Sequence, residues 1–536
     1  MSPADSLRRE RAVFAAGVAA IVVLAISLRL PGLAPPSLYL DDVWVALFAR
    51  EASLADLMAL RPPHPAGFMA LQALALRFLP DAELSVQLIP FAASLALIPL
   101  GAWLIRRRTG GVSGGILAAV LLALNPTLSD YSVRAKPYAT DALLSLILVA
   151  ATLACLTEPA PRRLWRLALL APLAILFSYP AALVGAVGFA VAFAAVFAST
   201  RERGPLTRIA GTFVAVEVAL GILLVYGQSN QALTKFWQEG FVPLQRPSDA
   251  LVFIASRTAL VLMSSFPRDW WALGILVPLA FALLLRRRET RAAAAFLAAL
   301  WASLFAAAAM RLYPVDGRTT SFAYPLVAVL AAWTLSSETR RAGLPLIREG
   351  IPAFLAAAIV LTSAVRVAYP PFEDARLVRA LAAEARPGDT VLLYPHTNWS
   401  AGYYGGWSVR LVRADYYGAG FEARLLREGS VTLPGFPGYE DRPQLLDPAL
   451  RDLVSRKPES VLYLATHLEV NCCAAHVHIR QFLGASGYVS ERLALAPGGE
   501  LIRFTRSPPP APSGPPPLLK GRGSPPGPGA SAPADP

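Results

Sequence analysis

The sequence predicts a polytopic α-helical membrane protein of about 11 transmembrane helices, followed by a C-terminal α/β domain outside the membrane. Three observations predict this fold class. The 536-residue chain is 55% hydrophobic and only 16% charged, its apolar residues lie in long runs, and its composition changes near residue 369. A helix of about 20 apolar residues crosses the hydrocarbon core of a bilayer and satisfies its own backbone hydrogen bonds.

The long apolar runs predict where the transmembrane helices lie. The first run is not a cleaved signal peptide, because Arg29 interrupts its end and no small-residue cleavage site follows. The predicted spans are 12–31, 84–105, 113–129, 139–156, 167–179, 181–199, 209–228, 270–285, 292–310, 321–336 and 350–368. Together they form a transmembrane domain over residues 1–368.

Basic residues predict the orientation of the spans, because Lys and Arg are retained on the cytoplasmic side. With a cytoplasmic N-terminus every second loop should be basic, and this alternation is observed. The residues concerned are Arg8, Arg9, Arg11, Arg106, Arg107, Arg108, Arg162, Arg163, Arg166, Arg201, Arg203, Arg208, Arg286, Arg287, Arg288, Arg340 and Arg341. The net charge of +13 is therefore largely topological and gives no reason to expect nucleic-acid binding.

The same alternation places 32–83, 229–269 and 311–320 outside, together with the chain after residue 369. The apolar segment 64–80 is short, and counting it as a span would invert the charge pattern. We therefore expect it to be an interfacial or re-entrant helix. Richness in Ala, Leu, Arg and Pro is typical of a GC-rich bacterial genome, so the expected location is the bacterial inner membrane.

The C-terminal part is expected to form an extracytoplasmic α/β domain over 369–506. Segment 375–385 has helical periodicity, 388–396 and 460–467 have the pattern of strands, and 488–506 has the pattern of a hairpin around Gly498 and Gly499. The tail 507–536 is dominated by Pro, Gly, Ser and Ala and is predicted to be disordered.

Three cysteines exclude an elaborate disulfide framework. Cys472 and Cys473 are adjacent and lie close to His476 and His478. Their spacing matches no established zinc pattern, so a metal site is not expected there.

Four polar segments lie on the predicted outer side, where ionisable groups next to apolar helices indicate function. The first, in the outer loop 32–83, contains Asp41 and Asp42 in LYLDDVW, between the apolar residues 38–40 and 43–45. Desolvation of two adjacent carboxylates tends to raise one pKa and leave the other group ionised, which suits base catalysis or the binding of a metal or hydroxyl. The alternative is a solvated loop.

The second segment, RPPHPAGF, places His64 before an apolar helix, either to bind a polar ligand or to cap the turn. The third, 129–144, carries Arg134 and Lys136 on the side that the positive-inside rule disfavours. A phosphate would compensate these cations, bidentate to Arg and as a point charge to Lys. The alternative is pairing with Asp130 or Asp141.

The fourth segment, 311–325, offers Arg311 and Arg318, either for a lipid-linked phosphate or for lipid headgroups. Carboxylates and cations on one face of a helical bundle suit the transfer of a sugar from a polyprenyl phosphate. A carboxylate deprotonates the acceptor while the cations stabilise the phosphate leaving group.

Two other classes of protein remain alternatives. A flippase or transporter of lipid-linked saccharides also binds phosphate, but its charges would lie near the bilayer midplane in paired broken helices. The charges of this chain collect at the outer ends of helices. A receptor-like protein, in which 369–505 binds a partner and the bundle is an anchor, would not need eleven spans.

The order of these motifs resembles the GT-C glycosyltransferase superfamily, in its RgtA/B/C/D-like, protein-O-mannosyltransferase and ArnT-related branch. The matching motifs are LYLDDVW, RPPHPAGF with Ala66 for a proline, RAKPYA with Lys136 for an arginine, and GRTTSFAYP. The resemblance covers roughly residues 10–505, including an outer α/β domain. It implies an inverting hexosyl or pentosyl transferase that uses a polyprenyl-phosphate sugar and acts on a lipid, polysaccharide or protein acceptor among the membrane lipids.

The resemblance also implies roles for single residues. Asp41 is the expected catalytic base, and Asp42, one methylene shorter than the family's Glu, would assist in positioning the acceptor or a metal. The residues expected to bind substrate are His64, Arg134, Lys136, Tyr138 and Arg318. Lys136 stands where the family has Arg, and a lysine cannot bind a phosphate in the bidentate way that an arginine can. No cofactor is expected, because many relatives work without a metal and no further ligand cluster is evident. A divalent metal is the alternative.

Overall fold

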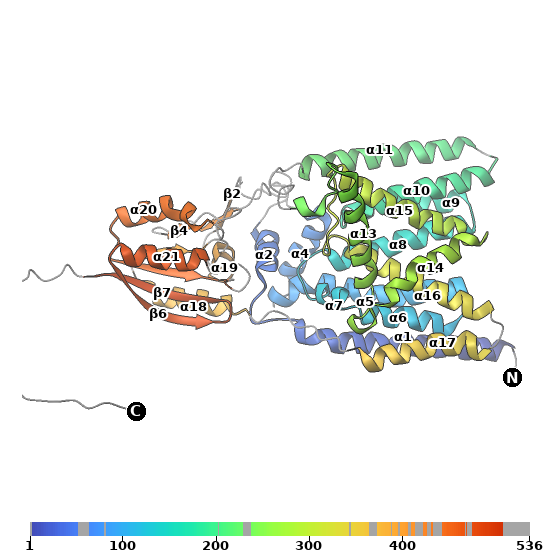
Figure 1. The fold of residues 1–536 in the computed structure, drawn as a ribbon, viewed down its shortest axis with the longest axis horizontal. Coiled ribbons are helices and arrows are strands. Elements are labelled where there is room, and N and C mark those ends of the chain that lie inside the picture. Colours follow the sequence, from blue (N-terminus) through green and yellow to red (C-terminus); the bar gives the residue numbers. More distant parts are fainter. Residues whose placement is uncertain are drawn as a thin grey trace, which may run out of the picture.

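A computed structural model describes residues 3–51, 64–79, 82–201, 203–228, 237–341, 345–363, 372–386, 389–394, 397–405, 409–412, 422–425, 430–432, 442–466, 468 and 474–507. A long helical bundle and a smaller α/β unit lie end to end, and the N-terminus lies at the far end of the bundle (Figure 1). The predicted tail and the cysteine pair Cys472 and Cys473 lie outside the described residues.

The predicted spans coincide with helices of the bundle. These are α1 (Pro3–Arg29), α5 (Ala82–Thr109), α6 (Val112–Ala123), α8 (Tyr138–Thr157), α9 (Pro161–Ile175), α10 (Pro180–Ser199), α11 (Arg203–Gln228), α14 (Leu273–Arg286), α15 (Arg291–Ala309), α16 (Tyr324–Arg341) and α17 (Pro345–Thr362). Among the described residues, α1, α5, α8, α10, α13 and α15 are long and apolar enough to cross a membrane, and several shorter helices are apolar. The chain is a polytopic α-helical membrane protein.

The prediction of one helix over 113–129 was wrong. Helix α6 ends at Ala123 and the short helix α7 (Pro126–Tyr131) begins after a break. Asn125 causes the break, because its side-chain oxygen accepts a hydrogen bond from Leu128 N at 2.8 Å and caps α7. Pro126 then occupies the first turn of α7, where its missing N–H costs nothing.

The segment 229–269, which the alternation of arginines places outside, contains a helix that the sequence analysis did not predict, α13 (Pro247–Ser264). Its window is apolar enough for a span, but only 6% of that window is buried. Figure 1 shows α13 at a steep angle to α11 and α14. Its run of apolar residues is interrupted by Arg257 and begins after Asp249, which weakens the periodic signal of a span.

The basic clusters gather at one end of the bundle. Arg340 donates to the carbonyl of Thr109, and Arg341 lies 3.6 Å from Glu289. The loops that follow α5, α14 and α16 therefore meet there, as the alternation of arginines predicts. We call this the basic end, and the opposite end, which carries α2 (Leu40–Glu51) and α4 (Ala66–Phe78), the site end.

The α/β unit has three layers. Its sheet runs β4-β1-β5-β7-β6, with β4 (Ser430–Thr432), β1 (Thr390–Leu393) and β5 (Ser460–Ala465) parallel, and β7 (Gly499–Arg506) and β6 (Tyr488–Ala496) antiparallel. A separate ribbon pairs β2 (Val409–Val412) with β3 (Glu422–Leu425). The predicted hairpin is present, and Gly498 turns it with a φ of +78°.

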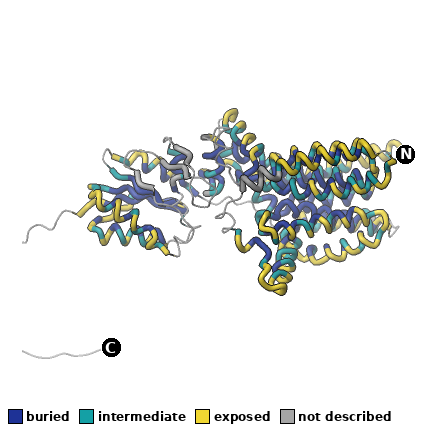
Figure 2. The backbone as a smooth tube through the Cα atoms, turned by 90° about the horizontal axis from the view of Figure 1, so that it is seen from above, coloured by how far each residue is buried: buried dark blue, intermediate teal, exposed yellow. Residues whose placement is uncertain are grey.

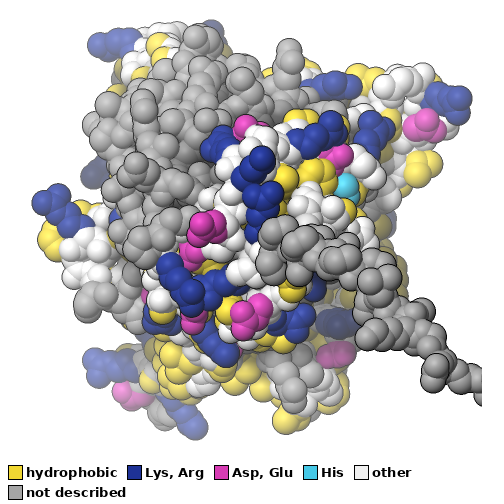
Figure 3. All heavy atoms as spheres, turned by 90° about the vertical axis from the view of Figure 1, so that its left-hand side faces the viewer, with side chains coloured by type: hydrophobic (Ala, Val, Ile, Leu, Met, Phe, Trp, Pro, Cys, Tyr) yellow, Lys and Arg dark blue, Asp and Glu magenta, His cyan; other side chains and the backbone are white. Residues whose placement is uncertain are grey.

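Successive side chains of the strands face opposite sides of the sheet. Val461 and Tyr463 pack against α20 (Asp447–Ser455) and α21 (Ala474–Ala485), whereas Leu462 and Leu464 pack against α18 (Asp374–Glu384) and α19 (Thr397–Tyr404). The sheet is thus buried between the helices (Figure 2). The end of the α/β unit that faces away from the bundle carries charged side chains of both signs (Figure 3), as a surface in water should.

A labelling experiment tests the predicted orientation. In a background with all three cysteines replaced, a membrane-impermeant maleimide should label Arg456→Cys, directly after α20, in intact spheroplasts. It should label Arg288→Cys at the basic end only after the membrane is broken. Both side chains are exposed, so access to the reagent decides the result. The reverse pattern would contradict the topology that the arginines predict.

Candidate active site

The two adjacent acids occupy the first turn of α2. The turn is closed by hydrogen bonds from Asp42 N and Val43 N to the carbonyl of Tyr39, at 2.7 and 2.8 Å. Negative side chains are favoured at a helix N-terminus by the unpaired N–H groups and the helix dipole. Neighbouring residues of a helix point about 100° apart, so the carboxylates face different surroundings. Asp42 is fully buried, whereas the Asp41 side chain is 40% exposed.

Asp42 joins α2 to the segment between α7 and α8. Its Oδ2 lies 2.7 Å from Arg134 Nε, and its Oδ1 accepts a hydrogen bond from Ala135 N at 3.0 Å. The Arg134 guanidinium lies over the ring of Tyr39, 4.1 Å from its centroid. Both carboxylate oxygens therefore hold the segment that precedes Lys136.

Asp41 faces two cations from distant parts of the chain. Its Oδ2 lies 3.8 Å from Lys136 Nζ and 3.7 Å from an Nη atom of Arg318. These distances exceed the 2.7–2.9 Å of a direct charge-assisted hydrogen bond. Lys136 is buried, and the Arg318 side chain is 42% exposed. The ammonium and guanidinium therefore keep donor capacity for another anion close to Asp41.

His64 lies beside Lys136. Its Nε2 is 3.4 Å from Lys136 Nζ, and its ring meets the edge of Trp44 with centroids 5.2 Å apart. Trp44 also lies 5.6 Å from the Lys136 ammonium. The predicted short helix is α4, and Gly67 in it approaches the carbonyl of Leu176 so closely that a Cβ would lie 2.6 Å from that oxygen. Arg61, which the same motif includes, lies outside the described residues.

Arg318 is held by a tight loop before α16. Asp316 Oδ1 accepts from Arg318 N at 3.1 Å, and the hydroxyl of Tyr324 donates to the carbonyl of Gly317 at 2.7 Å. Asp316 also lies 4.0 Å from Arg257 on α13. The guanidinium of Arg318 lies over Trp237, 5.1 Å from the ring centroid. Arg311, from the same sequence motif, is an exposed residue at the start of this loop with a φ of +59°.

Tyr138 is the first residue of α8, two positions after Lys136, and its ring lies 4.5 Å from that of Tyr131. The structure thus brings Asp41, Asp42, His64, Arg134, Lys136 and Arg318 together through direct contacts, with Tyr138 beside them in the chain. They come from segments that are as much as 277 residues apart, counted from Asp41 to Arg318.

The charges of the site act on one another. Burial raises the pKa of the Asp41 carboxyl. The charges of Lys136, Arg318 and Arg134 together lower this pKa by more than burial raises it, so the net shift is downward. Asp41 is therefore ionised at neutral pH and is not the acid of raised pKa that the sequence predicted for one of the pair. Burial lowers the pKa of Lys136, and the charges of Asp41 and Asp42 oppose that shift only in part.

The alternative partners proposed for the two cations are not the ones observed. Arg134 forms an ion pair with Asp42, and the carboxylate that faces Lys136 is that of Asp41, in place of Asp130 or Asp141. The charge of Arg134 still opposes the rise that burial causes in the pKa of Asp130. The reason is the fold, because α2 brings its acids against the α7–α8 segment from 92 residues away. The cations are thus partly compensated within the protein before any phosphate binds.

Two histidines on α21 of the α/β unit have carboxylate partners. His476 Nε2 lies 2.6 Å from Glu500 and His478 Nε2 lies 2.7 Å from Asp447. Within the described ranges, no group of three or more His, Cys, Asp or Glu side chains is arranged to hold a metal. The expectation of a reaction without a metal stays a prediction.

The sequence interpretation missed three aromatic residues of the site. Tyr39, Trp44 and Trp237 each present a ring to a cation of the site. Such contacts stabilise a desolvated cation by about 0.5–2 kcal/mol. Tyr39 and Trp44 flank the acids in LYLDDVW, so aromatic residues beside the acidic pair were the available signal. No such signal pointed to Trp237, because it lies far in the chain from all four polar segments.

The fold and site together define a polytopic membrane protein with a carboxylate facing cations at one end of its bundle. No family model and no curated protein matches the sequence. Among solved structures, ArnT from Cupriavidus metallidurans bound to undecaprenyl phosphate aligns over 92% of this chain and 97% of its own, at 12% identity and a TM-score of 0.52. The Archaeoglobus fulgidus oligosaccharyltransferase with zinc and sulfate aligns over 88% and 71%, at 12% identity and 0.52.

Both of these proteins are GT-C glycosyltransferases. At 12% identity the likeness concerns the fold, and it confirms the fold that the order of motifs predicted: this chain has the GT-C fold.

The two acids should differ in their effect on stability. Asp42→Asn leaves the Arg134 charge without its carboxylate, and breaking a buried pair costs about 3–5 kcal/mol. We expect the purified variant to unfold at a clearly lower temperature than the wild type. Asp41→Asn is the matched control and should change the unfolding temperature little, because Asp41 is partly exposed and its contacts are longer. Equal losses would contradict the structural role assigned to Asp42.

Proposed function

We propose that the protein is an integral-membrane glycosyltransferase that moves a sugar from a polyprenyl-phosphate donor to an acceptor at the extracytoplasmic face. The observation that carries the proposal is the position of Asp41, an ionised carboxylate within 4 Å of both Lys136 and Arg318. A base and a site for a phosphate leaving group thus lie side by side at the end of a helical membrane bundle.

In the proposed reaction, Asp41 takes the proton from the acceptor hydroxyl or amine. The acceptor atom forms a bond to the anomeric carbon of the sugar while the bond from that carbon to the phosphate oxygen breaks. The electron pair of the broken bond stays on the polyprenyl phosphate, which gains one negative charge. A single displacement inverts the anomeric carbon. No metal is required, since Lys136 and Arg318 can stabilise the leaving group.

The roles of the two acids differ in this proposal. Asp41 touches the reacting atoms, whereas Asp42 holds Arg134 and Ala135 N and positions the cations. Arg134, His64 and Tyr138 form the surroundings of the donor phosphate and sugar. The lipid-linked donor is supported by the likeness in fold to ArnT with undecaprenyl phosphate bound. The arginine alternation supports a cytoplasmic N-terminus, and composition supports the bacterial inner membrane.

Asp41→Asn should greatly slow transfer. General-base catalysis contributes about 10²–10⁴-fold, so kcat should fall by at least about 100-fold with purified protein and radiolabelled polyprenyl-phosphate sugars. Because Asp41 attracts both cations away from the donor, its KM for the donor should not rise. Wild-type turnover should persist in EDTA.

Asp452→Asn on α20 is the control, because it removes an exposed carboxylate of the α/β unit. Turnover by Asp41→Asn equal to that of this control would exclude Asp41 as the base. Translocation of the saccharide lipid in vesicles, with no transfer from any donor, would instead identify a flippase. Loss of turnover in EDTA would show that a metal is required.

Lys136 should set the alkaline limit of activity. Its cationic form is needed to bind the phosphate, and burial lowers its pKa below the usual 10.5. Transfer should therefore fall as the pH rises through this lowered pKa. In Lys136→Arg the guanidinium stays charged to above about pH 12, so the alkaline decline should disappear from the pH profile of kcat/KM. An unchanged decline would show that another group titrates.

A further inference from the structure

Helix α2, which carries Asp41, lies between the bundle and the α/β unit. One hydrophobic cluster contains Leu47 and Phe48 of α2, Phe68 and Met69 of α4, and Tyr403 of α19. The catalytic helix is therefore packed on one side by the site end of the bundle and on the other by a helix of the α/β unit. The α/β unit is thus a part of the surroundings of the site.

Hydrogen bonds from the α/β unit hold the chain that leads into α2. The hydroxyl of Tyr404 accepts from Leu38 N at 2.7 Å, and the hydroxyl of Ser37 accepts from Ala375 N at 2.9 Å. The rings of Tyr39 and Phe372 lie 5.4 Å apart. These contacts reach three consecutive residues, and Asp41 follows two positions later.

A second set of bonds holds the other end of α2. Arg50 donates from one Nη atom to the carbonyl of Tyr403 at 2.9 Å and from the other to that of Gly402 at 3.0 Å. Both carbonyls belong to the last turn of α19, where no intrahelical donor is available. The Arg50 guanidinium also lies 4.8 Å from the centroid of the Tyr403 ring. A cation that caps a helix C-terminus in this way is favourable.

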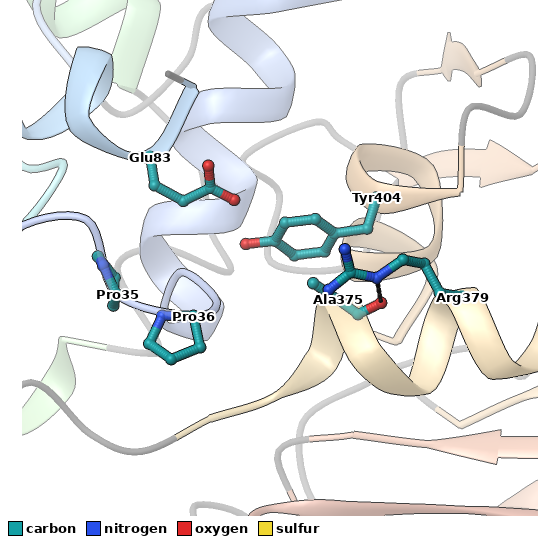
Figure 4. A pocket seen from close by; sticks show the side chains of 6 residues that line it. All are labelled: Pro35, Pro36, Glu83, Ala375, Arg379 and Tyr404. Carbon is teal, nitrogen blue, oxygen red and sulfur yellow. Dashed lines mark hydrogen bonds between the residues drawn. The ribbon is translucent and has the colours of Figure 1, made fainter.

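The seam next to Tyr404 is not filled by side chains. A cavity of about 210 Å³ lies there, lined by Pro35, Pro36, Glu83, Ala375, Arg379 and Tyr404. In Figure 4 Tyr404 reaches from α19 across this space towards Pro36 and Glu83, with Arg379 beside it. Next to this cavity, the hydrogen bonds of Tyr404 with Leu38 N and of Ser37 with Ala375 N join the two units.

We propose that Tyr404 and Arg50 are positioning residues through which the α/β unit holds α2, and with it Asp41, in place against Lys136 and Arg318. The inference rests on the proposed function in that it takes Asp41 as the base. Asp41 lies 3.7–3.8 Å from the two cations. A displacement of the base by about 1 Å can cost about 100-fold in rate. The α/β unit then acts on catalysis without touching the substrate.

The test compares Tyr404→Phe with Tyr488→Phe in the full-length protein. Tyr488 is a matched control, because its hydroxyl also forms one hydrogen bond to the backbone, donating to the carbonyl of Pro458 at 3.0 Å, within the α/β unit and away from α2. Amide hydrogen exchange over residues 37–51 reports the order of α2 without any substrate. Steady-state kinetics report kcat and the KM for the donor separately.

Tyr404→Phe should raise the exchange rate at the start of α2 about 5-fold, the effect of losing one hydrogen bond. Its kcat should fall about 5- to 10-fold with the donor KM unchanged, whereas Tyr488→Phe should alter neither. Unchanged exchange would overturn the proposal. So would faster exchange with normal kcat, or a lower kcat with normal exchange, because Tyr404 would then not act through α2.

A second variant and a substrate-free measurement cover two ways in which the test of Tyr404→Phe could fail. If Tyr404→Phe does not accumulate in membranes, Ser37→Ala removes the acceptor of Ala375 N, and Ser455→Ala on α20 is its control. If the wild type transfers no sugar, the proposed function fails, and hydrogen exchange alone then decides whether the α/β unit holds α2.

Discussion

The buried pair of Asp42 and Arg134 is the interaction on which the rest of the site depends. A fully buried carboxylate costs several kcal/mol unless it is paired and hydrogen-bonded. Asp42 meets this condition only when α2 docks on the segment between α7 and α8, where Arg134 Nε and Ala135 N occupy both of its oxygens. Lys136 is then placed as well, because its N–H donates to the carbonyl of Arg134 at 2.7 Å. One ion pair thus fixes the positions of both the proposed base, Asp41, and a cation beside it.

The geometry of a helix explains how two adjacent acids can do different work. The rotation of about 100° per residue sends Asp42 into the protein and leaves Asp41 at the edge of the site. The buried member is saturated by fixed partners, whereas the exposed member has only longer contacts to Lys136 and Arg318. A base needs lone pairs that an acceptor can reach, and only Asp41 satisfies this requirement in the arrangement observed.

The sequence predicted the fold class and most of the site because both depend on strong one-dimensional signals. Long apolar runs and alternating arginines indicated the helices and brought the segments of Asp41, Lys136 and Arg318 to the same end. The partner of Arg134 was not predictable, since Asp130 and Asp141 are nearer in the chain and only the packing of α2 decides for Asp42. The contacts of Arg50 and Tyr404 between α2 and α19 were likewise invisible, because they join residues more than 350 positions apart.

The balance of charge at the site explains how the proposed transition state would be stabilised. Two carboxylates, Asp41 and Asp42, face three cations, Arg134, Lys136 and Arg318, so the named groups carry one net positive charge. A polyprenyl-phosphate sugar is a phosphodiester with one negative charge and would neutralise the site. Cleavage adds a second negative charge to the phosphate while Asp41 becomes neutral on taking the acceptor proton. The cations that Asp41 shared before the reaction are then released to the leaving group as its charge develops. They interact more strongly in the transition state than in the ground state, which is the condition for catalysis.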